Sequence, residues 1–127
     1  MSNWGLIVLL VIVVAYFFWA RRPVKGIQNI TADALVEEIK TKGNALSIVD
    51  VREPFEFSSG HIAKARNIPL GSLSKRLKEL SPDGEIVFVC RSGNRSMQAA
   101  KIAKKEGYKA VYNLTGGMSR WTGPVKK

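Results

Sequence analysis

The sequence predicts an α/β domain built on a central, mainly parallel β-sheet flanked by helices. Short apolar runs rich in β-branched residues alternate along the chain with stretches in which apolar residues recur at helical spacing. Turns containing glycine or proline separate these segments. Strands that are joined through helices pair in parallel, so the alternation favours one domain with one core. Binding sites in such sheets lie beyond the carboxyl ends of the strands.

The first elements are predicted from their boundaries. Residues 27–30 form a short first strand, and Thr31 then begins a helix over 32–42, because a threonine hydroxyl can accept a hydrogen bond from a free N–H of the first turn. Gly43 ends that helix. The run 45–51 is rich in β-branched residues and predicts a strand buried on both faces.

The rest of the domain repeats this pattern. Pro54 favours the first position of a helical turn, and leucines at helical spacing define the next helix. The remaining expected elements are, in order, a helical turn over 54–57, a small strand over 65–68, a helix over 72–80, a strand over 86–89, a helix over 95–106, a strand over 110–114 and a helical turn over 118–121.

A separate apolar segment precedes the domain. Trp4–Ala20 carries no charge over seventeen residues and has aromatic residues at both ends, as membrane-spanning helices do. A cleaved signal peptide would begin with basic residues, and a buried core helix would be amphipathic, so both alternatives are less favoured. The predicted division of the chain is a transmembrane anchor over 1–22, a linker over 23–26, the domain over 27–123 and a basic tail over 124–127.

The basic residues after this segment predict its orientation. Arg21, Arg22 and Lys25 follow the apolar run, whereas no basic side chain precedes it. The positive-inside rule then places the domain in the cytoplasm, held at the inner membrane through residues 4–20. The single cysteine agrees with a reducing compartment, because small secreted domains usually carry paired cysteines.

The net charge of +10 comes from 20 Lys and Arg against 10 Asp and Glu. One interpretation is a solvated basic surface near anionic headgroups, and another is a field that attracts small anionic substrates. Nucleic acid is not an expected partner, because the basic residues are spread along the chain without interleaved aromatic residues. One cysteine and one histidine cannot supply a Cys₄ or Cys₂His₂ zinc site, and no metal or cofactor is expected.

Cys90 is the candidate nucleophile, since it stands where a predicted strand turns into a predicted helix. Backbone N–H groups, the positive end of the helix dipole and two guanidinium groups all lower a thiol pKa and hold an anion. The candidate substrate-binding residues are Arg91, Ser92, Gly93, Asn94, Arg95 and Ser96. Asp50 and Arg52 end the neighbouring strand and are the candidate supporting residues.

Several of these residues have a second, structural interpretation. Arg91 is expected to contact the substrate directly, with an ion pair at the sheet ends as its structural alternative, whereas Arg95 is expected to have a mixed role that combines catalysis with a pairing to Asp50. Asp50 either braces the active loop or forms an ordinary ion pair at the strand end. Ser96 supplies a hydroxyl donor or caps the helix, and His61 is more often a structural histidine than a base.

The domain resembles the rhodanese family of sulfurtransferases over residues 27 to 123, through four motifs in family order. These are Asp50-Val51-Arg52-Glu53-Pro54-Phe55-Glu56-Phe57; Gly60-His61-Ile62 with Ala65 and Asn67-Ile68-Pro69; Cys90-Arg91-Ser92-Gly93-Asn94-Arg95-Ser96; and Gly107-Tyr108 with Leu114-Thr115-Gly116-Gly117-Met118 and Trp121. The resemblance implies a single rhodanese domain similar to the membrane-anchored proteins of bacteria. Lys64 departs from the family, which commonly has glycine there.

The resemblance implies that a Cys90 thiolate takes a sulfur atom from thiosulfate or a persulfide, becomes a persulfide and passes the sulfur on. The implied partners are a small anionic sulfur donor, a thiol or cyanide acceptor, and a sulfur-relay protein as an alternative. Two other functions remain open, a cysteine-dependent phosphatase or arsenate reductase and a non-catalytic membrane-tethered adaptor. Those oxyanion enzymes place five residues between cysteine and arginine, whereas Cys90 and Arg95 have four between them, which favours a single sulfur atom.

Overall fold

The computed structural model describes residues 3–21 and 26–127 of the 127-residue chain. Most of the predicted linker over 23–26 lies outside these residues, as do Arg22 and Lys25. Ahead of the domain, helix α1 spans Trp4–Arg21, and its apolar side chains are exposed from Trp4 to Trp19.

The predicted membrane span is corrected by the structure. No helix within residues 3–21 and 26–127 combines the length and the apolar character needed to cross a membrane. The 18 residues of α1 rise by about 27 Å at about 1.5 Å per residue, whereas the hydrocarbon core is about 30 Å thick. The orientation inferred from Arg21, Arg22 and Lys25 depended on that span and falls with it.

A five-stranded parallel sheet forms the centre of the domain, as predicted. Its strands lie in the order β1-β6-β5-β2-β4, and every neighbouring pair is parallel. In the central pair Asp50 lies opposite Val89, so both strands end at the same edge of the sheet. The strands are β1 (Ile27–Ile30), β2 (Leu46–Asp50), β4 (Arg66–Asn67), β5 (Glu85–Val89) and β6 (Ala110–Leu114).

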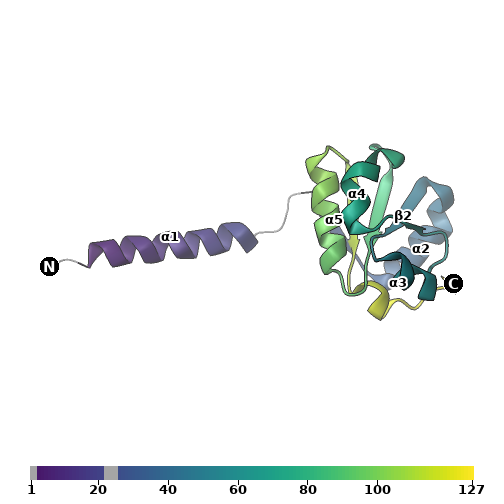
Figure 1. Ribbon diagram of the computed structural model, residues 1–127, viewed down its shortest axis with the longest axis horizontal. Helices are drawn as coiled ribbons and strands as arrows, with labels where there is room; N and C mark the ends of the chain where they lie inside the picture. The colour runs from purple at the N-terminus through teal and green to yellow at the C-terminus, as the bar shows by residue number, and fades with distance from the viewer. Residues whose placement is uncertain (1–2, 22–25) are drawn as a thin grey trace.

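Helices cover both faces of this sheet. Figure 1 shows α4 and α5 on one face and α2 and α3 on the other. The α-helices of the domain are α2 (Ala32–Lys42), α3 (Pro54–Ser59), α4 (Leu70–Arg76) and α5 (Asn94–Lys105). Three 3₁₀ turns accompany them, namely η1 (Gly43–Ala45), η2 (Leu77–Glu79) and η3 (Gly117–Arg120).

The central strand β5 supplies both halves of the core, because successive side chains of a strand point to opposite faces. Ile86 and Phe88 pack with the α4 and α5 side, which includes Ala99 and Ala100. Val87 and Val89 pack on the other side with Leu35 of α2 and Ile62. A strand buried on both faces therefore appears in the sequence as an unbroken apolar run.

Two differences from the prediction concern boundaries. The helix expected over 72–80 begins earlier, at Leu70, and its last turn is the separate 3₁₀ turn η2. The tail predicted over 124–127 instead contributes strand β7 (Val125–Lys126), which pairs antiparallel with β3 (His61–Ile62). The backbone N–H of Ala63 also donates to the carbonyl of Pro124, so the C-terminal residues are joined to the domain.

Candidate functional site

Cys90 lies directly after β5, and only 1% of it is exposed. The loop that follows folds back around its sulfur. The backbone N–H of Gly93 donates a hydrogen bond of 3.0 Å to Sγ, and the hydroxyl oxygen of Ser96 lies 3.3 Å from it. Gly93 has a φ of 110°, in the left-handed region that favours glycine, and α5 starts at the next residue.

These contacts decide the ionisation of the thiol. Burial raises the pKa of Cys90, but hydrogen bonds from the Ser96 hydroxyl and from the backbone N–H groups of Ser96, Gly93 and Ser92 lower it by more. The net effect is a pKa below the ordinary value for cysteine. Because the thiolate is the nucleophilic form, the loop activates the sulfur.

Ser96 connects the sulfur to a buried polar chain. Its hydroxyl also lies within hydrogen-bond distance of the Gly93 carbonyl, at 3.1 Å, and of the Asn113 side-chain oxygen. The Asn113 amide in turn donates to the side chain of Asn29, at 3.2 Å. Ser96 does not cap α5, because Gly93 occupies the position before the first helical residue. Asn113 was not identified as a site residue from the sequence, although a polar residue within the otherwise apolar run 110–114 indicates a buried hydrogen-bonding role.

The turn after β6 holds the other side of the loop. The backbone N–H of Met118 donates to the Cys90 carbonyl at 2.8 Å, and the N–H and hydroxyl of Ser119 donate to the Arg91 carbonyl at 3.0 and 2.8 Å. Gly117 has a φ of 53°, and a Cβ atom there would overlap the Cys90 carbonyl oxygen. The close approach of η3 to the loop therefore requires glycine at this position.

Arg95 pairs with Glu56 and not with Asp50, so the predicted Arg95–Asp50 pair is wrong. Two hydrogen bonds of 2.7 and 3.0 Å join the guanidinium to the Glu56 carboxylate. Glu56 is placed by the capping box at the start of α3, where it also accepts the backbone N–H of Glu53. The bond from Arg95, opposed by burial and aided by Glu53, lowers the pKa of Glu56 from 4.5 to about 2.

Asp50 forms the strand-end ion pair that was one of its two interpretations. Its fully buried carboxylate accepts bonds from the Arg52 side chain at 2.7 to 3.0 Å and from the Arg52 backbone N–H at 3.0 Å. Arg52 also donates to the Gly60 carbonyl, at 2.8 Å. The partner of the Asp50 carboxylate is therefore Arg52, which lies only two residues later at the end of the same strand.

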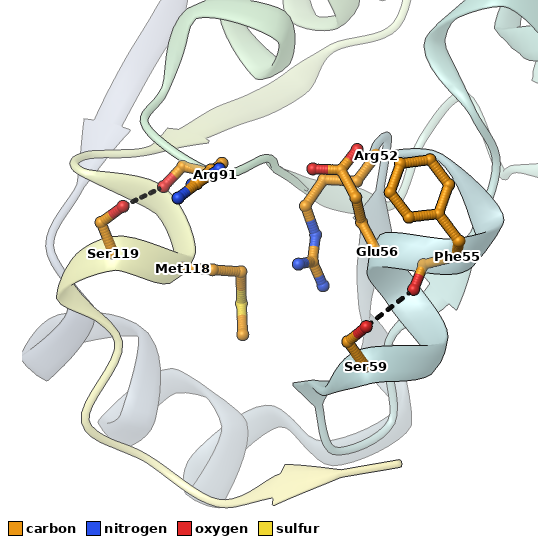
Figure 2. A pocket seen from close by; sticks show the side chains of 7 residues that line it. All are labelled: Arg52, Phe55, Glu56, Ser59, Arg91, Met118 and Ser119. Atoms are coloured by element: carbon orange, nitrogen blue, oxygen red, sulfur yellow. Dashed lines mark hydrogen bonds between the residues drawn. The ribbon is translucent and has the colours of Figure 1, made fainter.

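A cavity of about 400 Å³ opens beside the Cys90 loop. Figure 2 shows residues of α3 on one side and residues of the loop and η3 on the other, with Arg52 between them. The lining residues are Arg52, Phe55, Glu56, Ser59, Arg91, Met118 and Ser119. The exposed Arg91 forms no ion pair with any other residue of the described ranges, so its guanidinium is available to a ligand.

Comparison with known proteins connects this geometry to a family. The family model of the rhodanese-like domain matches residues 31–124. The chain belongs to the rhodanese-like domain family. It is 36% identical over 126 residues to the uncharacterized protein YqhL of Bacillus subtilis, covering 99% of this chain and 98% of YqhL. It is 40% identical over 100 residues to the putative sulfurtransferase YtwF of the same organism, and the match covers 79% of this chain and 95% of YtwF.

A solved structure shares the fold of this rhodanese-like domain. The rhodanese-related protein of Thermoplasma volcanium superposes with a TM-score of 0.69 at 36% identity, covering 78% of this chain and 97% of that one. Within residues 3–21 and 26–127, no group of three or more His, Cys, Asp or Glu side chains is arranged to hold a metal ion.

The structure also shows the surroundings of His61 and Lys64, two residues of the rhodanese-like domain that stood out in the sequence. His61 bonds through Nδ1 to the Phe57 carbonyl at 2.9 Å and stacks on the Phe57 ring at 3.7 Å, a structural arrangement. Lys64 has a φ of 74° and is the one non-glycine residue with positive φ in the described part of the chain. The glycine that Lys64 replaces in the family pattern suits this left-handed turn.

Proposed function

We propose that the protein is a sulfurtransferase that carries a sulfane sulfur as a persulfide on Cys90. The donor is thiosulfate or a persulfide, and the acceptor is a thiol or cyanide. The observation that carries the proposal is the loop around Sγ, where the Gly93 N–H at 3.0 Å and the Ser96 hydroxyl at 3.3 Å meet a buried sulfur. A backbone donor such as the Gly93 N–H stabilises both the thiolate and the persulfide anion.

Two displacement steps share this cysteine. In the first, the thiolate attacks the outer sulfur of thiosulfate, an S–S bond forms to Cys90, and the S–S bond of the donor breaks so that sulfite leaves with the electron pair. In the second, the acceptor attacks the outer sulfur of the persulfide, and the electron pair of the Cys90 S–S bond returns to Sγ as thiolate. No net oxidation or proton transfer is needed in either step when the acceptor enters as an anion.

The charges around the loop support a division of roles. Arg91 is exposed and unpaired within the described residues, so it is the group suited to hold the anionic donor. Arg95 is neutralised by Glu56 and acts by fixing the loop against α3. An oxyanion enzyme would need that arginine free for its substrate. The tight loop around the almost fully buried Cys90 suits a single sulfur atom better than a tetrahedral anion.

Steady-state transfer of sulfur from thiosulfate to cyanide tests the proposal with the full chain. Cys90→Ser should abolish thiocyanate formation, and Arg91→Gln should raise the KM for thiosulfate about tenfold, the usual effect of losing a charge-assisted hydrogen bond. Lys101→Gln is the matched control, because it removes one positive charge from an exposed position on α5. Thiocyanate formation by Cys90→Ser at the wild-type rate would reject the proposal.

A further inference from the structure

A chain of four side chains runs through the interior of the domain, from the Cys90 sulfur to the edge strand β1. The Ser96 hydroxyl lies 3.3 Å from Sγ and within hydrogen-bond distance of the Asn113 side chain, and the Asn113 amide donates to Asn29 at 3.2 Å. Cys90, Ser96 and Asn113 are buried, whereas Asn29 is exposed. The two asparagines thus connect the reacting sulfur to the surface of the molecule.

The register of the sheet brings these side chains together. Asn113 of β6 lies opposite Phe88 of β5 on one side and opposite Asn29 of β1 on the other. Side chains at paired positions of a sheet project to the same face, and Phe88 packs on the α5 side of the sheet with Ala99. Both asparagines therefore point to the face that α5 covers, where Ser96 lies in the first turns of that helix. A buried amide is costly unless it is hydrogen-bonded, and this chain satisfies it.

Ser96 has one hydroxyl proton and several acceptors within reach. They are the Cys90 sulfur, the Gly93 carbonyl at 3.1 Å and the side-chain oxygen of Asn113. When Cys90 is a thiol, its S–H can donate to the Ser96 oxygen, and the Ser96 proton then points to Asn113. When Cys90 is a thiolate, the charged sulfur is the stronger acceptor, and the Ser96 proton turns to it.

That turn leaves the oxygens of Ser96 and Asn113 facing each other without a proton between them. A flip of the Asn113 amide removes the conflict, because the oxygen and the NH₂ group have nearly the same shape and exchange places. The flipped Asn113 donates to Ser96 and presents its oxygen to Asn29, which flips in turn and donates to it. Asn29 is exposed, so water can replace the hydrogen bonds that it gives up.

The charged groups near the sulfur are held in place by other partners. Arg95 of α5 pairs with Glu56 of α3, and Asp50 at the end of β2 pairs with Arg52. Arg91 is exposed to solvent. The neutral chain is therefore the buried group that is free to reorient as the charge on the sulfur changes.

We propose that Asn113 and Asn29 are positioning residues for sulfur transfer, which act through Ser96 as a hydrogen-bond chain that reverses its direction as charge appears on or leaves Sγ. When the acceptor attacks the outer sulfur, the S–S bond breaks, its electron pair returns to Sγ, and the Ser96 hydroxyl turns to that pair without giving up its proton. When thiosulfate loads the cysteine, the pair forms the new S–S bond and the chain turns back. The inference rests on the proposed function, because it describes how the protein assists that reaction.

Titration of the Cys90 thiolate in the full chain, by ultraviolet absorbance and by the rate of alkylation, tests the chain without any sulfur donor. Asn113→Leu removes the hydrogen bonds and keeps a side chain of similar size. A chain that reverses loses the N–H that supports Ser96, so the midpoint should move to higher pH. Alkylation below the wild-type midpoint should slow about fivefold, the usual effect of losing one hydrogen bond. A fixed Asn113 acceptor would instead compete with Sγ for the Ser96 proton, so a midpoint at or below the wild-type value overturns the inference.

Asn29 offers a second variant at an exposed position, where a substitution leaves the core intact. Asn29→Asp can only accept hydrogen bonds, so it holds the Asn113 N–H and keeps the Asn113 oxygen on Ser96. The Cys90 midpoint should then lie at higher pH than in Gln28→Glu, the control that places the same charge on the neighbouring exposed residue. Equal midpoints at about 0.5 M salt, where exposed charges are largely screened, overturn the inference.

Discharge of the loaded protein links the chain to the reaction. The full chain is loaded with thiosulfate, freed of excess donor and mixed with cyanide, and loss of the extra sulfur is followed by intact mass. Asn113→Leu should slow this loss about fivefold, because Sγ leaves without the support of the chain. A wild-type rate overturns the inference while the uptake of sulfur still supports the proposed function. Failure of Cys90 to take up sulfur overturns both.

Discussion

The Glu56–Arg95 ion pair should stabilise the fold within a defined pH window, and Glu56→Gln tests this. Folding lowers the pKa of Glu56 from 4.5 to about 2 through the bond from Arg95. A depressed pKa means that the folded state favours the carboxylate. The stabilisation is therefore fully present above pH 4.5 and is lost as the pH falls through the folded pKa of about 2.

The magnitude follows from the same two values. At about 1.36 kcal/mol for each pH unit, the difference between 4.5 and about 2 corresponds to about 3 kcal/mol as an upper limit. The Glu56 side chain is 18% exposed and that of Arg95 is 34% exposed, so water screens the pair. We therefore expect Glu56→Gln to lower the free energy of unfolding by about 1–2 kcal/mol at pH 7.

Urea unfolding of the wild type and Glu56→Gln at pH 7 and pH 3 measures this difference. The glutamine oxygen can still accept the Glu53 N–H, so the substitution removes the charge and keeps the cap. The difference between the two proteins should shrink by more than half at pH 3. Glu37→Gln is the control, because its exposed pair with Lys40 at 3.7 Å should contribute almost nothing. Equal differences at the two pH values would refute the reasoning.

Three further predictions concern the turns and the sulfur. Lys64→Gly should raise the free energy of unfolding by about 0.5–1 kcal/mol and the melting temperature by a few degrees, because glycine adopts its φ of 74° without strain; Lys64→Ala should give no gain. Ser96→Ala should move the ultraviolet titration of the Cys90 thiolate to higher pH, and a shift to lower pH would contradict the hydrogen bond that we assign. Gly117→Ala should cost about 2 kcal/mol or more in urea unfolding and slow the alkylation of Cys90, because its Cβ overlaps the Cys90 carbonyl; wild-type values for both would contradict this packing.

The central sheet could be predicted from the sequence because its strands are buried on both faces. Such strands appear as continuous apolar runs, and those around Ile48, Val87 and Val111 mark β2, β5 and β6 closely. Strand β7 could not be predicted in the same way. It has two residues, and its partner β3 is more than sixty residues away, so its pairing depends on the completed fold.

In the candidate site, too, the local features could be predicted from the sequence, whereas the contacts between distant segments could not. The segment from Cys90 to Ser96 could be predicted because a strand end, a glycine and a helix start are local features. The partner of Arg95 could not, since choosing between Asp50 and Glu56 requires the position of α3. Asn113 reaches Ser96 from β6, and only its polarity within an apolar run indicated a role.

Intact mass spectrometry of the full chain after exposure to thiosulfate tests the central claim most directly. Cys90 is the only cysteine, so any persulfide formed on a thiol is formed there. We predict that the wild type gains one sulfur atom, that cyanide removes it, and that Cys90→Ser gains none. An unchanged wild-type mass, or the same gain in Cys90→Ser, would contradict the account of Cys90 as a sulfur carrier.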